Sequence, residues 1–573
     1  MSFRIRLTRG KKEEKVQLTF FGLVTSIAFR IFAYPATTLS RSIPLLRDNI
    51  MKSYLRITPE GLIADSLFFT TIAGILAAVG IWVGFGIYHI PYFLALIAAV
   101  PLVFVLIINA PKISASNRAS SIDMELPFVV GYISVLAGGG VSPLATLKRI
   151  SEMKLFPASA KEAKRILVEV NVFGADPITA IERIARWNPS RTFSEFLYGY
   201  TAVLKGGGNF LAYVQGKLHD IMENKASAVK RSADTTGTMA EAYLTVTVIL
   251  GMVLYTLYMV QTLIAGNTGG LTNLYFFAFI IVPLISAAFV WLTDSVQPKW
   301  PYVDYRPYKY FIYTAPVAAV FFFLPLGLHL YLRTAVTLII IASLPAYYSM
   351  GYARQKAGLE RMLPEFIRDV AEGRKTGLSP EVAIERLGGR HYGILSGHVK
   401  KMGAQLSWGV SLSKVVSTFT DAVSSWITKA IGILLIEVVD VGGGTIRSFS
   451  DMAEFTRNIN EMERERRSAL RPFVFITYIA GIMVIVTTFI LVYLLSAPAT
   501  LAHMGSTTAL PSVDPGTIDM LLTTAVFDTF VIGIVAGKMG ESGLSDGFKH
   551  AIALVIASVI AVYMAKFFIN IPL

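Results

Sequence analysis

The sequence of 573 residues contains no cysteine, and only 16% of its residues are charged. Without cysteine the chain has no disulfide, no thiolate nucleophile and no cysteine-ligated zinc. Its seven histidines do not occur in a metal-binding spacing such as H-E-x-x-H. We therefore expect no metal and no cofactor.

What the chain has instead is apolar sequence, with 54% hydrophobic residues and a mean hydropathy of +0.57. A run of roughly 20 apolar residues can cross a bilayer. Nine runs qualify, at 66–88, 91–109, 242–264, 273–292, 310–328, 332–349, 473–495, 518–537 and 550–569. We predict an all-α, polytopic membrane protein with about nine transmembrane helices.

The runs fall into groups that divide the chain into six regions. The first region, 1–64, is polar apart from Leu18–Tyr34, which we expect to be an interfacial amphipathic helix ended by Pro35. The others are two spans in 65–109, a polar helical region in 110–240, four spans in 241–349, a second polar helical region in 350–472 and three spans in 473–573.

Basic residues indicate the sidedness of these regions. Two spans precede the first polar region and four separate it from the second, so both regions and the amino terminus should share one side. On this topology all but two of the 52 Lys and Arg residues lie on that side, the exceptions being Arg333 and Lys566. The positive-inside rule then predicts a cell-membrane protein whose amino terminus and two polar regions are cytoplasmic. It also explains the net charge of +14 without a nucleic-acid partner.

The two polar regions begin their short helices with the same pattern. Gly140–Ile150 reads GVSPLATLKRI and Gly377–Leu387 reads GLSPEVAIERL. A Ser or Asp before Pro is typical of a helix start, because the side chain caps a free N–H and Pro fits the first turn. We expect such caps at Ser142-Pro143, Asp176-Pro177 and Ser379-Pro380, and a weaker one at Ser411.

Other landmarks keep nearly the same register. Pro127 and Pro364, the segments KGGGNF and VGGGTI, and the pairs Arg231-Ser232 and Arg467-Ser468 all recur at almost the same separation along the chain. We interpret the polar regions as two homologous helical bundles, each joined at its carboxyl end to a membrane helix. The glycine clusters lack the Lys-Ser/Thr of a nucleotide-binding loop.

Asp528 is the one carboxylate near the middle of a predicted span. A transporter could use it as a proton or cation site, with Lys566 as a shallower partner. Alternatively the carboxyl is structural and is satisfied by Thr524 and neighbouring helices. An intramembrane aspartyl protease would need a second embedded carboxylate, which the sequence lacks.

The paired openings ELPFVVGYISVLAGGGVSPLATL and MLPEFIRDVAEGRKTGLSPEVAI, each followed by a charged helix that enters a span, resemble the type II secretion system F domain family. The carboxyl-terminal stretch from Gly533 is similar to archaeal members, and the whole looks most like the members that serve archaella. This resemblance implies a non-enzymatic membrane platform that docks a hexameric motor ATPase and couples its movements to assembly and rotation of filament subunits. Platforms of an archaeal type IV adhesion pilus or secretion system remain alternatives.

Basic residues of the bundles are candidates for ATPase docking in that case: Lys205, Arg374, Lys375, Arg447, Arg464, Arg466 and Arg467. Three of them belong to the run EMERERRSALR, Glu461–Arg471. The alternative interpretation of this run is a solvated helix face that anchors the chain on the inner side or meets anionic lipids. A ring-shaped partner would suit a homodimer or a higher symmetry.

Overall fold

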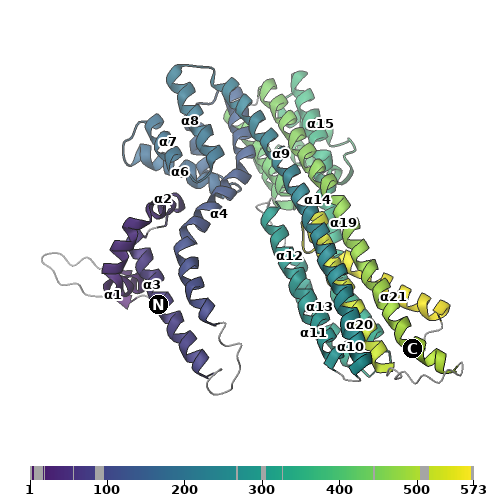
Figure 1. The fold of residues 1–573 in the computed structure, drawn as a ribbon. Helices are drawn as coiled ribbons and strands as arrows, with labels where there is room; N and C mark the ends of the chain where they lie inside the picture. The colour runs from purple at the N-terminus through teal and green to yellow at the C-terminus, as the bar shows by residue number, and fades with distance from the viewer. Residues whose placement is uncertain are drawn as a thin grey trace. The chain divides into compact units, whose positions relative to one another are not determined.

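The computed structural model describes residues 3–4, 17–18, 20–55, 57–83, 96–265, 269–297, 305–325, 327–442, 445–503 and 515–569, nearly all of them helical (Figure 1). A two-residue antiparallel pair, β1 (Phe3–Arg4) with β2 (Gln17–Leu18), is the exception. The predicted all-α membrane fold is confirmed. The chain divides into two compact units, Met1–Leu218 and His219–Leu573.

The first unit starts with helices α1 (Phe20–Ser42), α2 (Pro44–Ser53) and α3 (Pro59–Ile81). The prediction that Pro35 ends the first helix was wrong, because α1 continues through Pro35 with a kink at Phe32. Proline removes one helical hydrogen bond but bends a helix without ending it when packing holds both halves. Here α1 packs on α3, and Thr25 Oγ1 donates to Asp65 Oδ2 at 2.9 Å.

The long helix α4 (Leu96–Gly138) leads from an apolar half into the first bundle. The bundle continues with α5 (Pro143–Glu152), α6 (Pro157–Asn171), α7 (Pro177–Arg186), α8 (Arg191–Gly206) and α9 (Phe210–Leu244), which belongs to the second unit from His219 on. Its core is aliphatic and aromatic, with Phe196, Tyr200 and Leu136 fully buried. We call α4–α9 the first bundle.

The second unit contains the same succession of helices. Here α14 (Leu330–Lys375) enters, followed by α15 (Pro380–Leu387), α16 (Ser396–Ser407), α17 (Leu412–Ala422), α18 (Trp426–Gly442) and the 58-residue α19 (Ile446–His503). We call α14–α19 the second bundle. The start of each of its helices follows that of its counterpart at a nearly constant spacing, α14 excepted, so the duplication extends over every short helix.

The remaining helices of the second unit are mainly apolar. They are η3 (Thr245–Leu250), α10 (Gly251–Ala265), α11 (Gly269–Phe276), η4 (Phe277–Ile281), α12 (Val282–Val296), α13 (Arg306–Phe323), α20 (Pro515–Glu541) and α21 (Gly547–Ile569). The elements η3 and η4 are π-helical. Helix α9 continues through η3 into α10 without a break, as α19 does from its polar to its apolar half.

Eight helices among the described residues are long and apolar enough to cross a membrane, against about nine predicted. They contain the segments Pro59–Ile81, Val100–Gly138, Phe210–Tyr258, Thr272–Val296, Leu330–Lys375, Ile446–Tyr493, Gly516–Glu541 and Gly547–Met564. The difference is α13, which begins with the polar residues around Arg306 and Lys309.

Helix α13 nevertheless matches the length of a crossing. Its 18 residues extend about 27 Å, close to the hydrocarbon thickness. Three contacts pair it antiparallel with α14: Tyr310 with Tyr348, Thr314 with Ile341, and Phe322 with Arg333. Because α13 covers the whole apolar half of α14, it fits the membrane as a ninth crossing.

The carboxyl-terminal hairpin of α20 and α21 is packed through glycines. A Cβ added at Gly537 would lie 2.1 Å from Gly547 N, and one added at Gly533 would lie 2.3 Å from Ala551 Cα. Glycines four residues apart allow two membrane helices to approach this closely. The segment that resembles archaeal members therefore forms a tight hairpin.

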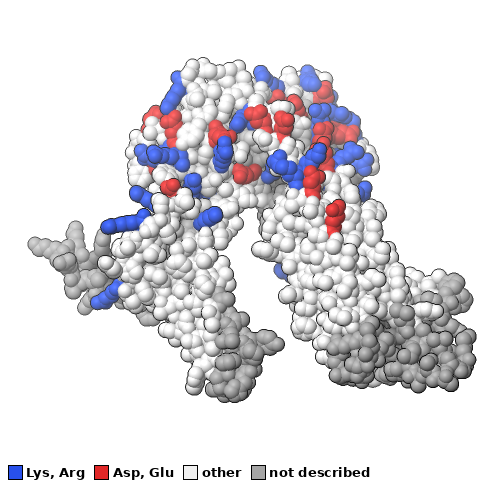
Figure 2. All heavy atoms as spheres, viewed as in Figure 1, with Lys and Arg blue, Asp and Glu red and all other residues white. Residues whose placement is uncertain are grey.

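Charged side chains are unevenly distributed within each unit. In the second unit the Lys, Arg, Asp and Glu side chains gather over the end that carries α15 and the polar parts of α14 and α19, and the visible surface beyond them is nearly free of charge (Figure 2). This pattern is that of a membrane-embedded half and an aqueous half.

Candidate functional sites

The predicted helix caps can be followed atom by atom. Ser142 Oγ accepts from Ala145 N at 3.4 Å, and Ser379 Oγ accepts from Val382 N at 3.3 Å. Asp176 Oδ2 accepts from Ile178 N at 3.1 Å. Pro143, Pro177 and Pro380 each occupy the first turn of their helices. Ser411 precedes α17 without a side-chain cap.

Four of the basic candidates lie on exposed surface of the bundles. Lys205 Nζ pairs with Glu182 at 2.7 Å, and Lys375 Nζ pairs with Glu372 at 2.8 Å. Arg447 and Arg464 are exposed, at the start and the middle of the polar half of α19. Side-chain pairs of this kind exchange readily with water and leave the cations accessible to a partner.

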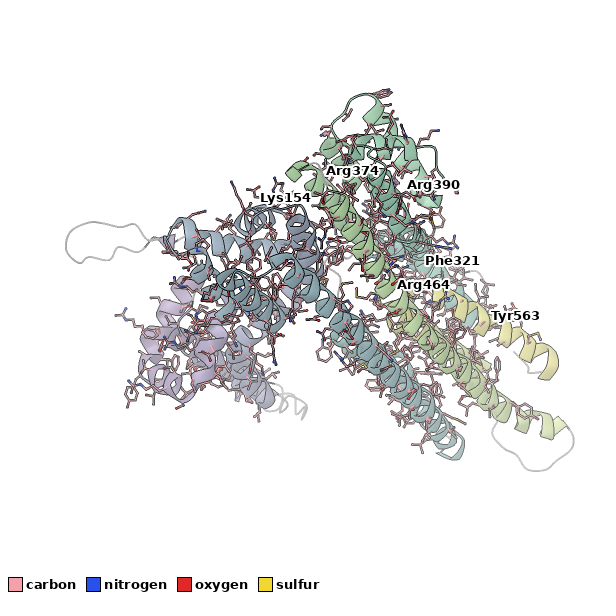
Figure 3. All side chains as sticks on the ribbon, turned by 90° about the horizontal axis from the view of Figure 1, so that it is seen from above. Lys154, Phe321, Arg374, Arg390, Arg464 and Tyr563 are labelled. Carbon is pink, nitrogen blue, oxygen red and sulfur yellow. The ribbon has the colours of Figure 1, made fainter. Side chains whose placement is uncertain are left out.

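Arg374 is partly enclosed by its own bundle. Its guanidinium donates to Leu378 O at 2.5 Å and lies 5.9 Å from the Phe449 ring centroid. Arg374 and Arg390 lie at the end of the second unit where the short helices gather, and Arg464 lies further along α19 (Figure 3). Arg374 therefore closes the turn between α14 and α15.

Arg466 is not an accessible docking cation, contrary to the prediction. It is 7% exposed, donates twice to Glu463 at 2.9 and 2.7 Å, and donates to Ser542 Oγ at 2.9 Å. Ser542 lies in the turn between α20 and α21, so this arginine joins the second bundle to the membrane hairpin. A local charge pattern cannot reveal a partner that lies so far along the chain.

Arg467 also makes internal ion pairs although it is partly exposed. It donates to Glu360 on α14 at 2.7 Å and to Glu463 at 3.3 Å. Burial opposes ionisation of Glu463, but Arg466, Lys356 and Arg467 together outweigh burial and lower the pKa of that carboxyl. Burial raises the pKa of Glu360 against the pull of Lys356 and Arg467. Arg467 is thus shared by Glu360 of α14 and Glu463 of α19, which joins these two helices.

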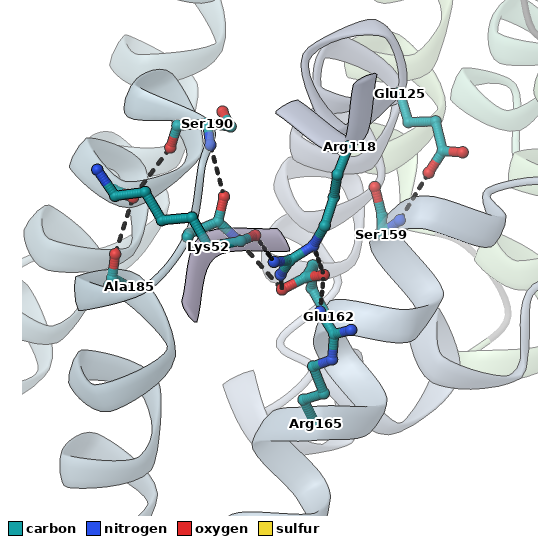
Figure 4. A network of polar contacts seen from close by, with 10 residues as sticks. Lys52, Arg118, Glu125, Ser159, Glu162, Arg165, Ala185 and Ser190 are labelled. Atoms are coloured by element: carbon teal, nitrogen blue, oxygen red, sulfur yellow. Dashed lines mark hydrogen bonds and ion pairs between the residues drawn. The ribbon is translucent and has the colours of Figure 1, made fainter. Parts of the chain in front are cut away.

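The first bundle has a different cluster, centred on Glu162 of α6 (Figure 4). Arg118 donates to both carboxylate oxygens at 3.1 and 2.6 Å, Arg165 donates at 2.6 Å, and Asn188 Nδ2 donates at 3.1 Å. Arg118 also donates to Lys52 O at 2.6 Å. The cluster therefore ties α4 and α6 to the end of α2.

Tyr54 and Glu125 extend this cluster on its two sides. The Tyr54 ring lies 4.2 Å from the Arg118 guanidinium and 3.6 Å from that of Arg165, which is a favourable cation–π geometry. Glu125 on α4 accepts from Ser159 N at 2.7 Å at the start of α6. Burial raises the pKa of Glu125, and the backbone N–H donors partly offset this.

One polar tie is common to both bundles. Ser190 caps α8 and donates to Asp123 on α4, while Ser425 caps α18 and donates to Glu360 on α14 at 2.8 Å. The two carboxylates are separated by nearly the same length of chain as the two serines, so they are counterparts in the repeat. Both serines are buried. The duplication thus preserves a serine–carboxylate bond between the entering helix and the fifth helix.

An exposed aromatic side chain is also repeated. Phe173 follows α6 and is 70% exposed, and Trp408 follows α16 and is 83% exposed. Each precedes a glycine with positive φ, Gly174 at 66° and Gly409 at 78°, which turns the chain out of the helix. The dipeptides Phe173-Gly174 and Trp408-Gly409 can be aligned from the sequence alone, but neither aromatic residue is among the predicted docking residues.

Asp528 is buried at 2% exposure between the apolar helices of the second unit. Tyr255 Oη donates to its Oδ2 at 2.7 Å, and its Oδ1 has no hydrogen-bond partner among the described residues. The expected partner Thr524 instead bonds to Leu521 O at 2.7 Å. The side chain of Lys566 lies outside the described residues.

Comparison with known proteins agrees with this architecture. The family model "Type II secretion system (T2SS), protein F" matches residues 130–258 and 366–493. The matched segments start within α4 and α14 and end within α10 and α19, so each includes the membrane helix that follows its bundle.

A protein described as "Uncharacterized protein MJ1286", from Methanocaldococcus jannaschii, is 22% identical over 503 residues, which is 80% of this chain and 82% of that protein. Its description names no activity or partner. No solved structure shows a significant match to the chain.

Proposed function

This chain carries two domains of the type II secretion system protein F family, and we propose that it is the platform on which a cytoplasmic ATPase drives assembly of a type IV pilus-like filament. The observation that supports this role most is the continuity of the helices. α19 runs for 58 residues, about 87 Å, from the second bundle into the apolar half of the unit. A stiff helix of this kind can transmit a displacement that a flexible linker would dissipate.

We propose that both bundles and the amino terminus face the cytoplasm. All but two of the Lys and Arg residues lie in these regions or in the linker and loop expected on the same side, which supports this orientation. The pairing of α13 with α14 supports it as well, because a ninth crossing makes the number of spans between the bundles even.

The ATPase would dock on the exposed basic residues and the repeated aromatics. Lys205, Lys375, Arg447 and Arg464 offer accessible positive charge, and Phe173 and Trp408 offer apolar anchors of the kind that dominate interface energies. Because Phe173 and Trp408 occupy equivalent positions in the two bundles, they suit a homohexamer, which carries several copies of the same binding pocket. These pockets would be apolar with acidic rims.

The filament served is proposed to be an archaellum, with rotation added to assembly. The three carboxyl-terminal crossings and their glycine-packed hairpin support this member of the family over shorter ones. Filament subunits and lipids would contact the apolar helices, and a homodimer would suit the ring. One alternative is a platform with the same role for an adhesion pilus or a secretion system. The alternative from another functional class is a transporter that uses Asp528.

Co-purification with the secretion ATPase encoded in the same genome tests the docking proposal. The double variant Phe173→Ala with Trp408→Ala should reduce recovered ATPase at least tenfold, since each lost aromatic anchor costs about 1–3 kcal/mol. The matched control is Tyr198→Ala, a half-exposed aromatic of α8 whose counterpart is Ile433. Undiminished recovery with the double variant would refute these anchors.

Loss of the gene then identifies the filament. We expect cells without this protein to lose swimming and surface archaella. Retained swimming with lost adhesion pili would assign the platform to the pilus, and solute flux that Asp528→Asn abolishes would favour the transporter.

A further inference from the structure

A cavity in the apolar part of the second unit surrounds Asp528. Residues from four helical segments line it: Thr247, Val248, Gly251, Met252, Tyr255, Phe277, Val282, Val484, Thr487, Thr488 and Asp528. It has room for about one water-sized occupant. None of the lining residues is basic, so among the described side chains no cation faces the carboxylate.

The cavity lies where the two repeats meet in the membrane. Val248, Gly251 and Met252 follow the first bundle, and Val484, Thr487 and Thr488 are their counterparts at one constant offset along the chain. Equivalent faces of two duplicated helices therefore line one cavity, and α20 adds Asp528. Membrane proteins built from repeats commonly bind ligands at such an interface.

Departures from α-helical geometry shape the same cavity. Thr247 and Val248 belong to the π-helical segment η3, and Phe277 begins the π-helical segment η4. π-helical turns are rare and are found mostly at functional sites. Two of them on neighbouring helices converge here, beside the buried carboxylate.

The polar atoms of the cavity are incompletely satisfied. Asp528 Oδ1 and Thr247 Oγ1 are both buried without a hydrogen-bond partner among the described residues. Thr488 Oγ1 donates to Val484 O at 2.9 Å, so its oxygen lone pairs remain free to coordinate. The available ligands are all oxygen atoms, which hard cations prefer.

We propose that this cavity binds one monovalent metal cation, with Asp528 as the charged ligand and Thr247, Thr488 and Tyr255 as candidate neutral ligands. A single positive charge balances the single carboxylate, whereas a divalent ion would leave an uncompensated charge in the membrane interior. The cation would join α20 to the helices that descend from both bundles. Its occupancy would therefore set how firmly the two repeats are held together.

Thermal unfolding of the full-length chain in detergent micelles tests the proposal. Midpoints are compared in LiCl, NaCl, KCl and choline chloride at equal ionic strength. We expect at least one alkali chloride to raise the midpoint by a few degrees over choline chloride, with saturation as its concentration increases. Asp528→Asn should abolish the difference, and Glu454→Gln, at an exposed position of α19, should retain it.

A second variant keeps the test valid if Asp528→Asn does not fold. Thr247→Val keeps the shape of the side chain and removes one oxygen, so it should raise the half-saturating cation concentration about tenfold. Equal midpoints in all four salts would overturn the proposal. The Asp528 carboxyl would then be protonated, or a water molecule would occupy the cavity. An alkali effect that persists in Asp528→Asn would overturn it too. Neither result depends on the ATPase or the filament.

Discussion

The two bundles share their helix order and differ in what their buried carboxylates hold. In the first, Glu162 binds Arg118 and Arg165 and ties the short helix α6 to α4 and to the end of α2. In the second, Glu360 and Glu463 bind arginines on α19 and tie the two long helices to each other. The same fold is therefore fastened to an amino-terminal helix in one copy and to the membrane hairpin in the other.

This difference indicates a division of labour. Arg466 donates to Ser542 between α20 and α21, so the second bundle is hydrogen-bonded to the turn of the membrane hairpin. The fastening of the first bundle is to Lys52 O and the Tyr54 ring, which lie outside any predicted span. Both bundles continue into a membrane helix, so what distinguishes the second bundle is this additional contact with the membrane hairpin.

The largest expected effect follows from Glu463→Gln. It leaves the buried guanidinium of Arg466 without its carboxylate, and breaking a buried ion pair from one side costs about 3–5 kcal/mol. We expect a clearly lower midpoint of thermal unfolding. Glu461→Gln is the control, since its pair with Arg457 is exposed and 3.8 Å long, and should change the midpoint little. Equal effects of the two variants would contradict a structural role for the buried pair of Glu463 and Arg466.

Glu162→Gln should show whether the Glu162 cluster of the first bundle acts independently of the Glu463 cluster of the second. Arg118 and Arg165 lose their shared partner, at a cost of about 3 kcal/mol. Amide hydrogen exchange should increase in 44–54 and 157–190 and remain unchanged in 446–470. Glu463→Gln should give the opposite pattern. Increased exchange in both regions for either variant would mean that the bundles are not fastened independently.

The turn that holds Ser542 should make stability depend on pH. Burial, and then repulsion from Glu541, raise the pKa of Asp546 to about 6, although Lys549, Lys356 and His550 oppose this. A raised pKa means that the folded state binds this proton more tightly than the unfolded state does, so protonation stabilises the fold at low pH. This stabilisation is lost as the pH rises from about 4 to above 6.

Asp546→Asn should therefore stabilise the protein by about 2–3 kcal/mol at pH 7 and have little effect at pH 4. The measurement is the difference in unfolding midpoint between variant and parent across this range. A difference that does not vary with pH would show that Asp546 is ionised normally.

Ser190→Ala and Ser425→Ala test what the bundles have in common. Each removes a helix cap and a bond to a carboxylate of the entering helix, worth about 1–2 kcal/mol. Equal losses of stability would support the equivalence of the two ties. A loss confined to one variant would mean that only that copy depends on the bond.

The smallest effect on stability is expected for Lys205→Glu. Its pair with Glu182 is exposed, so the midpoint of unfolding should not change measurably. Recovered ATPase should fall if the first bundle contributes to docking. A lower midpoint with unchanged recovery would assign Lys205 a structural role.

Local patterns predicted much of this architecture. Ser142, Asp176 and Ser379 cap helices because Ser or Asp before Pro specifies a helix start within a single turn. Apolar length located eight of the membrane helices, and register revealed the duplication. These features depend on neighbours along the chain.

Tertiary partners could not be predicted in the same way. The burial of Arg466 depends on Ser542, and the hydrogen bond of Asp528 comes from Tyr255, in a helix far away along the chain. A charged run looks the same in the sequence whether its guanidinium groups point to solvent or into a helix interface. The continuation of α1 past Pro35 likewise depends on packing against α3.

Sidedness is the most direct test of the account, and the absence of cysteine makes it simple. Single variants Lys205→Cys and Lys375→Cys place one thiol on each bundle at an exposed position. With a membrane-impermeant maleimide, we predict that both thiols react in inverted vesicles and neither reacts in intact cells. Reaction of one thiol from outside and the other from inside would contradict the account.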